Sequence, residues 1–474
     1  MITEAIVAEL ENIVGSSNVS KAESDRITHS YDATMEEFLP DVVVYAENTE
    51  QVRKIALLAN THRLPILPRG AGSGFTGGSL PIRGGIVLVL TRMNTIRLID
   101  SDNLIAVVEP GVVTADLQRA VEKQGLFYPP DPASKEFSTL GGNIAECAGG
   151  PRCVKYGVTK DFVLGLEVVT AQGDVIRTGG QTLKNVVGYD LTKLMVGSEG
   201  TLGIVTEITL KLLPKPEADK TMLVQFETIE GAAQAVSAII RAKIVPTTLE
   251  FLDGATISCI RDISPIPLPP QCSALLIIEV DGDPDLIEKQ AAKILEVVRP
   301  LGVVDVRVAA TREEAEEIWQ VRRNVSPSLR KINPDKFNED IVVPRSKVPE
   351  MIRALEKISQ DYAVPIVNFG HAGDGNIHVN VMVDLRETGM EEKVHQVMEH
   401  IFTAAVALKG SLSGEHGIGT SKARYLGMEL DPSTIAYMRA VKHAFDPNNI
   451  LNPGKIFIEP DLLLPIQERQ DEHK

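Results

Sequence analysis

The segment from Arg69 to Gly78 constrains most strongly what this chain can fold into, because it holds five glycines in nine residues. Glycine lets backbone N–H groups approach a ligand and turn towards it, since no Cβ intervenes. A run of such amides forms a concave, positively polarised cradle for phosphate, and Arg69 adds a positive charge. The same composition suits a flexible linker, so this segment alone leaves cradle and linker open.

Gly72, Gly74 and Gly77 have the spacing G-x-G-x-x-G. That spacing indicates a dinucleotide-binding turn only where a helix opens inside it. Here Gly78-Ser79-Leu80-Pro81 follows, and residues 86–90 are expected to form a strand instead. We therefore predict that loop amides, rather than a helix dipole, hold the phosphate.

Two more glycine-rich stretches favour a ligand cradle over a flexible linker. We expect a second glycine loop at 138–150 and a third at 197–205. Each lies beside expected secondary structure, whereas linker glycines usually keep company with serine and other polar residues. Strands are expected at 41–46, 64–67, 86–90, 103–109, 164–170, 174–178 and 204–212, with a helix that Thr49 caps and that runs to about residue 61. Together the three loops predict one long ligand lying across the domain.

From about residue 218 the pattern becomes β-α-β-β-α-β, the order of a ferredoxin-like split unit. The expected strands are 221–227, 246–252, 273–280 and 303–309, and the expected helices are 230–243 and 284–299. Helices near 311–323 and 346–361, strands 364–369 and 376–383, and a helix at 390–408 follow. We predict an α+β fold with four parts: a lead-in at 1–37, a ligand-binding domain at 38–217, a second domain at 218–420 and C-terminal helices at 421–474, with a polar tail after 460.

Composition excludes several classes of protein. A net charge of −16 argues against a nucleic-acid partner. The sequence has no run of about 18 apolar residues, so we predict no membrane span. The first residues do not have the pattern of a signal peptide. Four cysteines are too few for a disulfide framework and suggest a cytoplasmic protein. Cys147 and Cys153 flank a tight loop, where two reduced thiols are favoured over a redox pair or a metal site.

His371 and His378 frame a second informative stretch, which runs to Asn380. Strand alternation puts His378 and Asn380 on one face and apolar residues on the other, and the glycine turn after His371 could fold it back towards them. Glu415 and His416 lie side by side among glycines farther on. Two histidines and a glutamate are a common ligand set for a divalent metal, which would leave His416 as a general base. The alternative is that all four are ordinary polar loop residues.

Arg322 lies one helical turn after Trp319, the only tryptophan of the chain. Arginine can bind a carboxylate through two parallel hydrogen bonds and so orient it. A solvated helix face is the alternative reading of this spacing.

Three motifs of the first half, Arg69–Gly78, Gly141–Ala145 and Gly197–Val205, resemble the flavin domain of the vanillyl-alcohol-oxidase-type flavoproteins. The later segments 371–380, 414–419 and 452–455 resemble their D-2-hydroxyacid dehydrogenase branch, which includes glycolate oxidase flavoprotein subunits, D-lactate dehydrogenases and D-2-hydroxyglutarate dehydrogenases. The resemblance covers nearly the whole chain. It implies a two-subdomain FAD-binding domain, a ferredoxin-like cap domain and a C-terminal segment that returns to the flavin.

The resemblance also implies roles for individual residues. His371, His378 and Glu415 would hold a divalent metal such as Zn, Mn or Fe. Arg322 would clamp the substrate carboxylate with help from Asn380, and His416 would take the hydroxyl proton. FAD, bound non-covalently because the first loop has no histidine, would contact Pro68, Arg69, Gly70, Ala71, Gly72, Ser73, Gly74, Thr76, Gly77, Gly78, Pro132, Ser138, Thr139, Gly141, Gly142, Asn143, Ala145, Glu199, Gly200, Gly203, Ile204, Val205 and Asn452.

The reaction implied is oxidation of a small D-2-hydroxyacid to the 2-oxoacid by hydride transfer to flavin N5. Relatives that oxidise D-2-hydroxyglutarate have a lysine before the position of Pro344 for the distal carboxylate. The position we align with it holds Asn338, and Lys336 is displaced. D-lactate or glycolate is therefore favoured, and D-2-hydroxyglutarate stays as the alternative.

The reduced flavin needs an electron acceptor. The spacing of Cys147 and Cys153 is not that of a ferredoxin, so the electrons would pass to an Fe–S subunit, an electron-transfer flavoprotein or a quinone, with peripheral membrane association through a partner. Two functions of other classes stay open. One is an FAD-binding assembly or electron-transfer subunit without turnover, and the other is a metal-dependent hydrolase without flavin.

Overall fold

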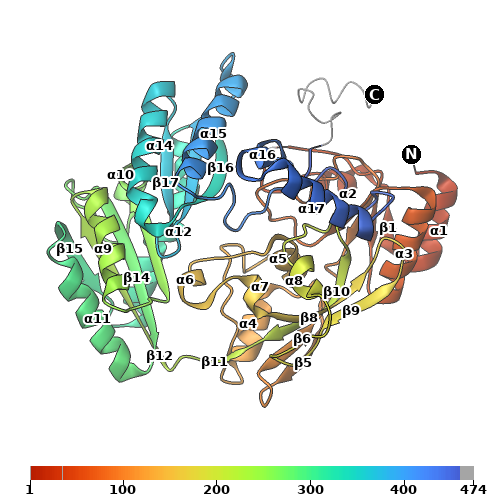
Figure 1. The fold of residues 1–474 in the computed structure, drawn as a ribbon, viewed down its shortest axis with the longest axis horizontal. Coiled ribbons are helices and arrows are strands. Elements are labelled where there is room, and N and C mark those ends of the chain that lie inside the picture. The colour runs from red at the N-terminus through yellow and green to blue at the C-terminus, as the bar shows by residue number, and fades with distance from the viewer. Residues whose placement is uncertain (1, 35, 459–474) are drawn as a thin grey trace. The chain divides into compact units, whose positions relative to one another are not determined.

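The computed structural model describes residues 2–34 and 36–458 (Figure 1). The predicted polar tail after residue 460 lies outside these residues. Contacts divide the chain into two compact units. The first unit comprises residues 1–148, 158–215 and 415–474, and the second comprises residues 149–157 and 216–414. The C-terminal segment from Glu415 thus belongs to the first unit, and the short segment 149–157 belongs to the second.

The first unit contains two larger sheets, as expected of a two-subdomain arrangement. The four-stranded sheet has the order β1-β2-β4-β3, in which β2, β4 and β3 run parallel. The five-stranded sheet is antiparallel with the order β5-β6-β10-β8-β9, and β11 pairs with β7. The strands are β1 Val19–Ser20, β2 Val42–Tyr45, β3 Ile66–Arg69, β4 Ile86–Val89, β5 Ile96–Asp100, β6 Ile105–Val108, β7 Leu126–Phe127, β8 Val163–Val169, β9 Val175–Gly179, β10 Ile204–Lys211 and β11 Leu213–Pro214.

Helices α1 and α3 cover the four-stranded sheet of the first unit and share its buried core. Ile450 and Leu451 complete that core, because the C-terminal segment runs along β3 with a backbone hydrogen bond from Ile66 N to Ile450 O of 2.8 Å. The helices of this unit are α1 Glu4–Val14, α2 Glu23–Thr28, α3 Thr49–His62, α4 Thr114–Glu122, α5 Leu140–Glu146, α7 Thr159–Phe162, α8 Leu191–Met195, α16 Leu426–Glu429 and α17 Pro432–Phe445.

The second unit has one seven-stranded antiparallel sheet with the order β15-β12-β14-β13-β17-β18-β16. Its first four strands reproduce the order of a ferredoxin-like unit, which confirms the predicted β-α-β-β-α-β pattern. The strands are β12 Ala218–Phe226, β13 Thr248–Asp253, β14 Ala274–Gly282, β15 Val303–Val308, β16 Asp335–Val342, β17 Ile366–His371 and β18 Asn376–Val383. The helices are α6 Cys153–Tyr156, α9 Ile229–Arg241, α10 Gly254–Ile260, α11 Pro284–Val298, α12 Arg312–Arg323, α13 Val325–Ser328, α14 Val348–Tyr362 and α15 Met390–Ala407.

Several sequence expectations need correction. The second glycine stretch contains a helix, α5, rather than a loop throughout, because the Thr139 side chain accepts a hydrogen bond from Gly142 N and caps it. Asn48, not Thr49, caps α3, since its side chain accepts from Gln51 N. Strands β5 and β16 were not predicted. Both carry several polar residues, which weaken the hydrophobic alternation that reveals a strand.

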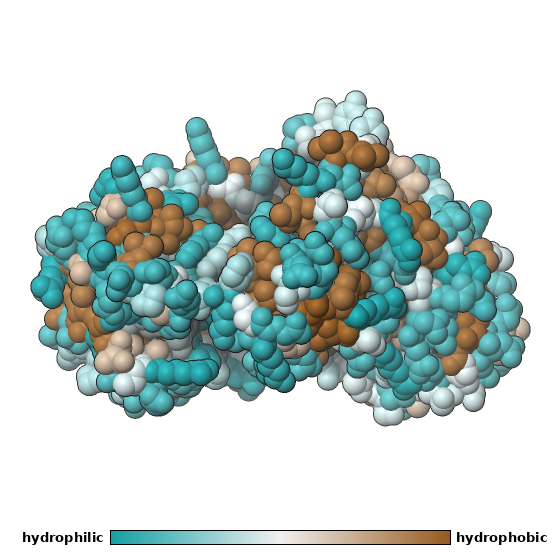
Figure 2. All heavy atoms as spheres, turned by 90° about the horizontal axis from the view of Figure 1, so that it is seen from below, coloured by the Kyte–Doolittle hydropathy of each residue, from teal (hydrophilic) through white to brown (hydrophobic). Residues whose placement is uncertain are grey.

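The surface is mixed in character. On the face in Figure 2, hydrophilic residues surround separate apolar patches. Among the described residues, the loop between β9 and α8 exposes a cluster of large apolar side chains, namely Leu183, Val186, Val187 and Tyr189. In these described parts of the chain, no helix has the length and apolar character needed to cross a membrane.

Candidate active site

The first glycine loop of the first unit follows β3 without a helix, as predicted. Gly70 packs against the segment that caps α5, since a Cβ at Gly70 would lie 2.2 Å from Thr139 Oγ1. Gly72 has φ +69°, and a Cβ there would lie 2.2 Å from Arg69 Nη2. The loop therefore needs glycine both for its conformation and for its packing on neighbouring segments.

The Arg69 side chain binds backbone carbonyls just after the glycine loop and in the lead-in segment. Its Nη1 donates to Ser79 O at 2.8 Å and its Nη2 donates to Tyr31 O at 2.6 Å. Burial lowers the pKa of this guanidinium, and Asp32 opposes that effect. Arg69 thus fixes the shape of the glycine loop through backbone carbonyls.

Asn452 links the first and third glycine stretches. Its side-chain amide donates to Gly78 O at 2.8 Å and to Glu199 O at 2.7 Å. Asn452 N also donates to Ile66 O at 2.9 Å, at the base of the first loop. The segment after α17 therefore joins two stretches that are separated from it by hundreds of residues.

The segment that follows Glu415 also packs against the first loop. Thr420 N donates to Thr76 O at 2.8 Å, and Thr76 Oγ1 donates to His416 O at 3.0 Å. The imidazole of His416 stacks on the Phe75 ring, with 5.0 Å between centroids and 27° between planes. Glu415 Oε1 lies 4.0 Å from His416 Nε2. The predicted base is thus held at the glycine loop by contacts within the first unit.

Charged side chains are buried around this loop cluster. Glu199 accepts hydrogen bonds from Ile418 N at 2.8 Å and Gly419 N at 2.7 Å, while burial raises its pKa. Lys455 donates to Leu80 O at 2.7 Å. Burial lowers the pKa of Lys455 to about 8, against the opposing effects of Glu199 and Asp32. Sequence analysis singled out Glu199 but gave no role to Lys455.

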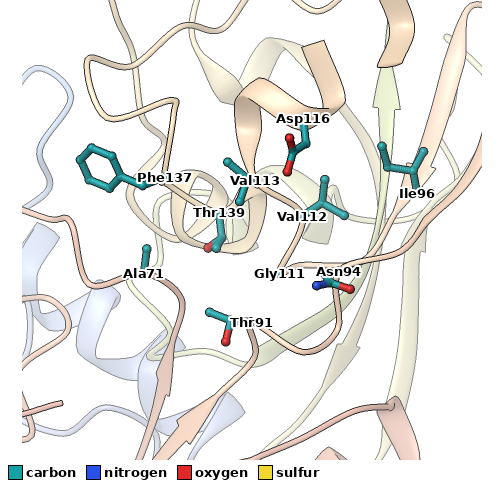
Figure 3. Close-up of a pocket in the computed structure, with 10 residues that line it drawn as sticks. All are labelled: Ala71, Thr91, Asn94, Ile96, Gly111, Val112, Val113, Asp116, Phe137 and Thr139. Atoms are coloured by element: carbon teal, nitrogen blue, oxygen red, sulfur yellow. The ribbon is translucent and has the colours of Figure 1, made fainter. Parts of the chain in front are cut away.

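The first unit also has a pocket of about 200 Å³ beside two predicted cofactor residues, Ala71 and Thr139 (Figure 3). Sequence analysis missed its remaining lining, because those residues come from turns, from the first residue of β5 and from the start of α4, and carry no glycine-rich signature. The missed lining residues are Thr91, Asn94, Ile96, Gly111, Val112, Val113, Asp116 and Phe137.

The other predicted cofactor residues also lie in the first unit. Pro68 lies on β3, and Pro132 and Ser138 lie in the segment before α5. Asn143 is buried in α5, where its amide donates to Thr114 Oγ1 at 2.7 Å. The rest lie in the first loop, in α5, between α8 and β10, or on β10: Ser73, Gly74, Gly77, Gly141, Gly142, Ala145, Gly200, Gly203, Ile204 and Val205.

In the second unit, β17 and β18 bring His371 and His378 together. Their Nε2 atoms are 3.3 Å apart and the rings meet at 84°. Both side chains are buried, with exposed fractions of 5% and 7%. The predicted alternation of β18 is confirmed, since His378 and Asn380 share the face of the sheet that carries His371.

Glu250 on β13 is a site residue that sequence analysis missed. It lies opposite His371 in the strand pairing and is fully buried. Its Oε1 accepts a hydrogen bond from His371 Nδ1, and its Oε2 accepts from Arg322 Nε at 2.9 Å. Burial alone would raise the pKa of Glu250, but His371 and Arg322 hold it below its usual range. A lone carboxylate within an apolar strand was the signal that could have found it.

Helix α12 carries Arg322 onto the same face of the sheet. Trp319, one turn earlier, donates from Nε1 to the half-buried Glu279 at 3.1 Å. The Arg322 guanidinium lies 4.4 Å from the centroid of the Phe369 ring. Arg322 is therefore packed against the sheet, and the alternative of a solvated helix face is wrong.

Asn380 is fully buried beside this group. It donates to Val367 O at 3.1 Å and to His378 O at 3.2 Å, and it accepts from Asn338 Nδ2 at 2.7 Å. Lys336 lies two residues from Asn338 on the same face of β16 and donates to Ser326 Oγ at 3.2 Å. Burial, assisted by Arg330, lowers the pKa of Lys336.

Comparison with known proteins gives the family. The chain matches the FAD binding domain over residues 40–179 and the C-terminal domain of FAD linked oxidases over residues 215–456. It is 47% identical to a glycolate oxidase subunit GlcD of Bacillus subtilis over 99% of this chain and all of that protein. It is 36% identical to a D-lactate dehydrogenase of Anaerostipes hadrus over 91% of this chain and 93% of that protein.

Among solved structures, p-cresol methylhydroxylase with bound substrate has the same fold, with a TM-score of 0.82 at 20% identity over 97% of both chains. A 4-ethylphenol oxidase from Gulosibacter chungangensis gives a TM-score of 0.77 at 21% identity, over 97% of this chain and 98% of that one. The fold is thus that of the vanillyl-alcohol-oxidase type. The chain belongs to the FAD-linked oxidases, in the branch of the glycolate oxidase subunits and D-lactate dehydrogenases, and is an FAD-dependent oxidoreductase.

Proposed function

We propose that this protein oxidises a small D-2-hydroxyacid, D-lactate or glycolate, to the 2-oxoacid. The observation that carries the proposal is the cluster on one sheet face of the second unit, where two histidines converge beside an arginine that the same buried carboxylate holds. The names of similar proteins, a glycolate oxidase subunit and a D-lactate dehydrogenase, support this substrate class.

A divalent metal fits the donor set. Two nitrogens that each lie about 2.0–2.1 Å from a tetrahedral zinc are roughly 3.3 Å apart, which matches the distance between His371 Nε2 and His378 Nε2. The same distance suits a hydrogen bond between the rings, so a metal titration distinguishes the two. We assign Zn, Mn or Fe to these histidines.

Glu415 is our candidate for the third ligand, because the chain just before it is anchored beside the histidines. Gly414 N donates to Asp340 Oδ2 at 2.9 Å, and Gly414 packs on Asn376, which pairs with His371. Glu415 is the next residue, and its Cα must lie within about 3.8 Å of that of Gly414.

FAD supplies the hydride acceptor when bound, and the metal a Lewis acid that lowers the pKa of the substrate hydroxyl. Arg322 binds the substrate carboxylate and orients it, with Asn380 beside it. His416 removes the hydroxyl proton as general base. We place part of the FAD in the pocket beside Ala71 and Thr139, which lies next to the glycine loop (Figure 3).

The substrate preference rests on β16. Asn338, at the position where a lysine would meet a distal carboxylate, donates to Asn380. Lys336 lies on the same face, and this observation keeps D-2-hydroxyglutarate as the second candidate. If Lys336 binds a distal carboxylate, Lys336→Met would raise the KM for D-2-hydroxyglutarate and leave that for D-lactate unchanged.

A partner protein or a quinone would take the electrons of the oxidation from the bound FAD. Two similar proteins are named as subunits of glycolate oxidase, which supports a partner chain. A subunit that binds FAD without turnover is the competing proposal, and the presence of His416, Arg322 and both histidines argues against it.

The test is the visible spectrum of the purified protein, before and after anaerobic addition of each acid. We expect flavin absorption that bleaches with D-lactate or glycolate and not with L-lactate. Prior removal of metal by a chelator should slow the bleaching, and added Zn²⁺ or Mn²⁺ should restore it. Flavin that no D-2-hydroxyacid bleaches would contradict the proposed activity, and bleaching by D-2-hydroxyglutarate alone would favour the second candidate.

A further inference from the structure

Glu250 contacts two residues to which the proposed function gives separate tasks. One carboxylate oxygen accepts from the imidazole of His371, and the other accepts from the guanidinium of Arg322. The side chain is fully buried and lies on a strand that carries no predicted ligand of its own. Its two hydrogen bonds thus connect the histidine pair with the candidate carboxylate clamp.

We propose that Glu250 is a positioning residue that fixes the ligand tautomer of His371 and the orientation of Arg322 together, an inference that rests on the proposed function. A carboxylate only accepts hydrogen bonds, so His371 must carry its proton on Nδ1. Its Nε2 then keeps a lone pair directed towards Nε2 of His378. Carboxylate partners of this kind orient metal-binding histidines and raise their basicity.

The contact with Arg322 has a second consequence. Glu250 accepts the hydrogen bond that Arg322 Nε donates, so a substrate carboxylate meets the two Nη groups at the far end of the guanidinium. The Phe369 ring holds the guanidinium plane from one side at 4.4 Å. Glu250 therefore selects which edge of Arg322 is offered to the substrate.

An amide cannot replace this carboxylate. In Glu250→Gln there is one carbonyl oxygen instead of two carboxylate oxygens. It can replace the acceptor of His371 or the acceptor of Arg322, but it cannot replace both. The NH₂ group would face the N–H donor of the remaining partner, or would favour the His371 tautomer whose Nε2 carries the proton. Metal binding and substrate binding should therefore weaken together.

The experiment measures Zn²⁺ affinity by calorimetric titration of metal-depleted protein that retains FAD, and then KM for D-lactate. We expect E250Q to bind Zn²⁺ about 10–100-fold more weakly than the wild type and to show a raised KM, with FAD absorption unchanged. The matched control is E279Q, because Glu279 is a half-buried carboxylate of the same sheet that accepts from Trp319 of α12 and from Thr221. Its Zn²⁺ affinity should stay within twofold.

A second measurement needs no variant at Glu250 to fold. In ¹⁵N-histidine spectra of the metal-depleted wild type, His371 should have the Nδ1–H tautomer, its signal assigned by loss in His371→Gln. An Nε2–H tautomer, or E250Q that binds Zn²⁺ as tightly as the wild type, overturns the inference while leaving the proposed activity intact. A wild type that binds none of Zn²⁺, Mn²⁺ and Fe²⁺ in this titration overturns both this inference and the metal assignment, whereas D-lactate bleaching would still be judged separately.

Discussion

Each unit builds its own candidate functional residues from a different kind of group. The first unit uses backbone groups of loops far apart in sequence, and Asn452 links two of them through carbonyls. The second unit uses side chains on one face of a sheet, where strand register sets His371 opposite Glu250. The difference teaches that a backbone cradle depends on loop conformation, whereas a sheet-face cluster depends on side-chain identity.

A substitution at His416 tests this comparison most directly, because His416 is a candidate catalytic side chain in the unit that otherwise uses backbone groups. We expect His416→Asn to lower kcat by about 10³-fold, since general base catalysis typically contributes 10²–10⁴-fold. Steady-state kinetics measure this, with FAD absorption as a check on folding. His443→Asn, at an exposed histidine of α17, is the control and should stay within twofold. Comparable losses in both variants would contradict the role of His416.

Gly72 tests the cradle side of the comparison. Gly72→Ala places a Cβ in left-handed backbone, 2.2 Å from Arg69 Nη2, so we expect FAD affinity to fall about 100-fold through a displaced loop, or about 2.7 kcal/mol. Flavin fluorescence titration measures the affinity. Zn²⁺ binding should not change. Gly125→Ala is the matched control, because Gly125 has φ +73° but nothing within 4 Å of a Cβ. If G125A weakens FAD equally, strain alone and not the cradle is responsible.

Lys455 tests whether a buried charge destabilises the first unit. Its pKa of about 8 in the folded state lies below its ordinary value of 10.5. At pH values between these two pKa values, the unfolded chain binds more protons than the folded one. The free energy of unfolding therefore rises with pH. FAD-depleted wild type should gain about 1.6 kcal/mol between pH 8 and 9.5 relative to Lys455→Met. Urea unfolding at each pH measures the difference, and parallel pH profiles would refute it.

Asn452 gives the smallest expected effect. Asn452→Ala leaves the carbonyl oxygens of Gly78 and Glu199 without their amide donor, so the first and third glycine stretches lose one link. We expect FAD affinity to fall about tenfold, or about 1.4 kcal/mol, measured by the same titration. The exposed Asn448, whose amide donates to Asn60 Oδ1, provides the control Asn448→Ala. An N452A protein with wild-type FAD affinity would mean that other contacts suffice to hold the loops.

The sequence by itself determined the local elements and much of the chemistry. The hydrophobic periodicity predicted the β-α-β-β-α-β order, because side-chain alternation and helical spacing are local properties. Glycine content identified the first loop, because left-handed backbone such as that of Gly72 favours glycine. His378 and Asn380 were placed on one face by the period of the strand alone.

Only the tertiary structure decided which distant groups meet. Glu250 becomes a candidate site residue only because it pairs with His371, which lies 121 residues away. No local pattern specifies that register. Asn452 reaches Gly78 across 374 residues, because the C-terminal segment adds to the edge of β3. Strand pairing and long-range packing follow from the burial of whole faces, which is a property of the folded chain rather than of any one segment.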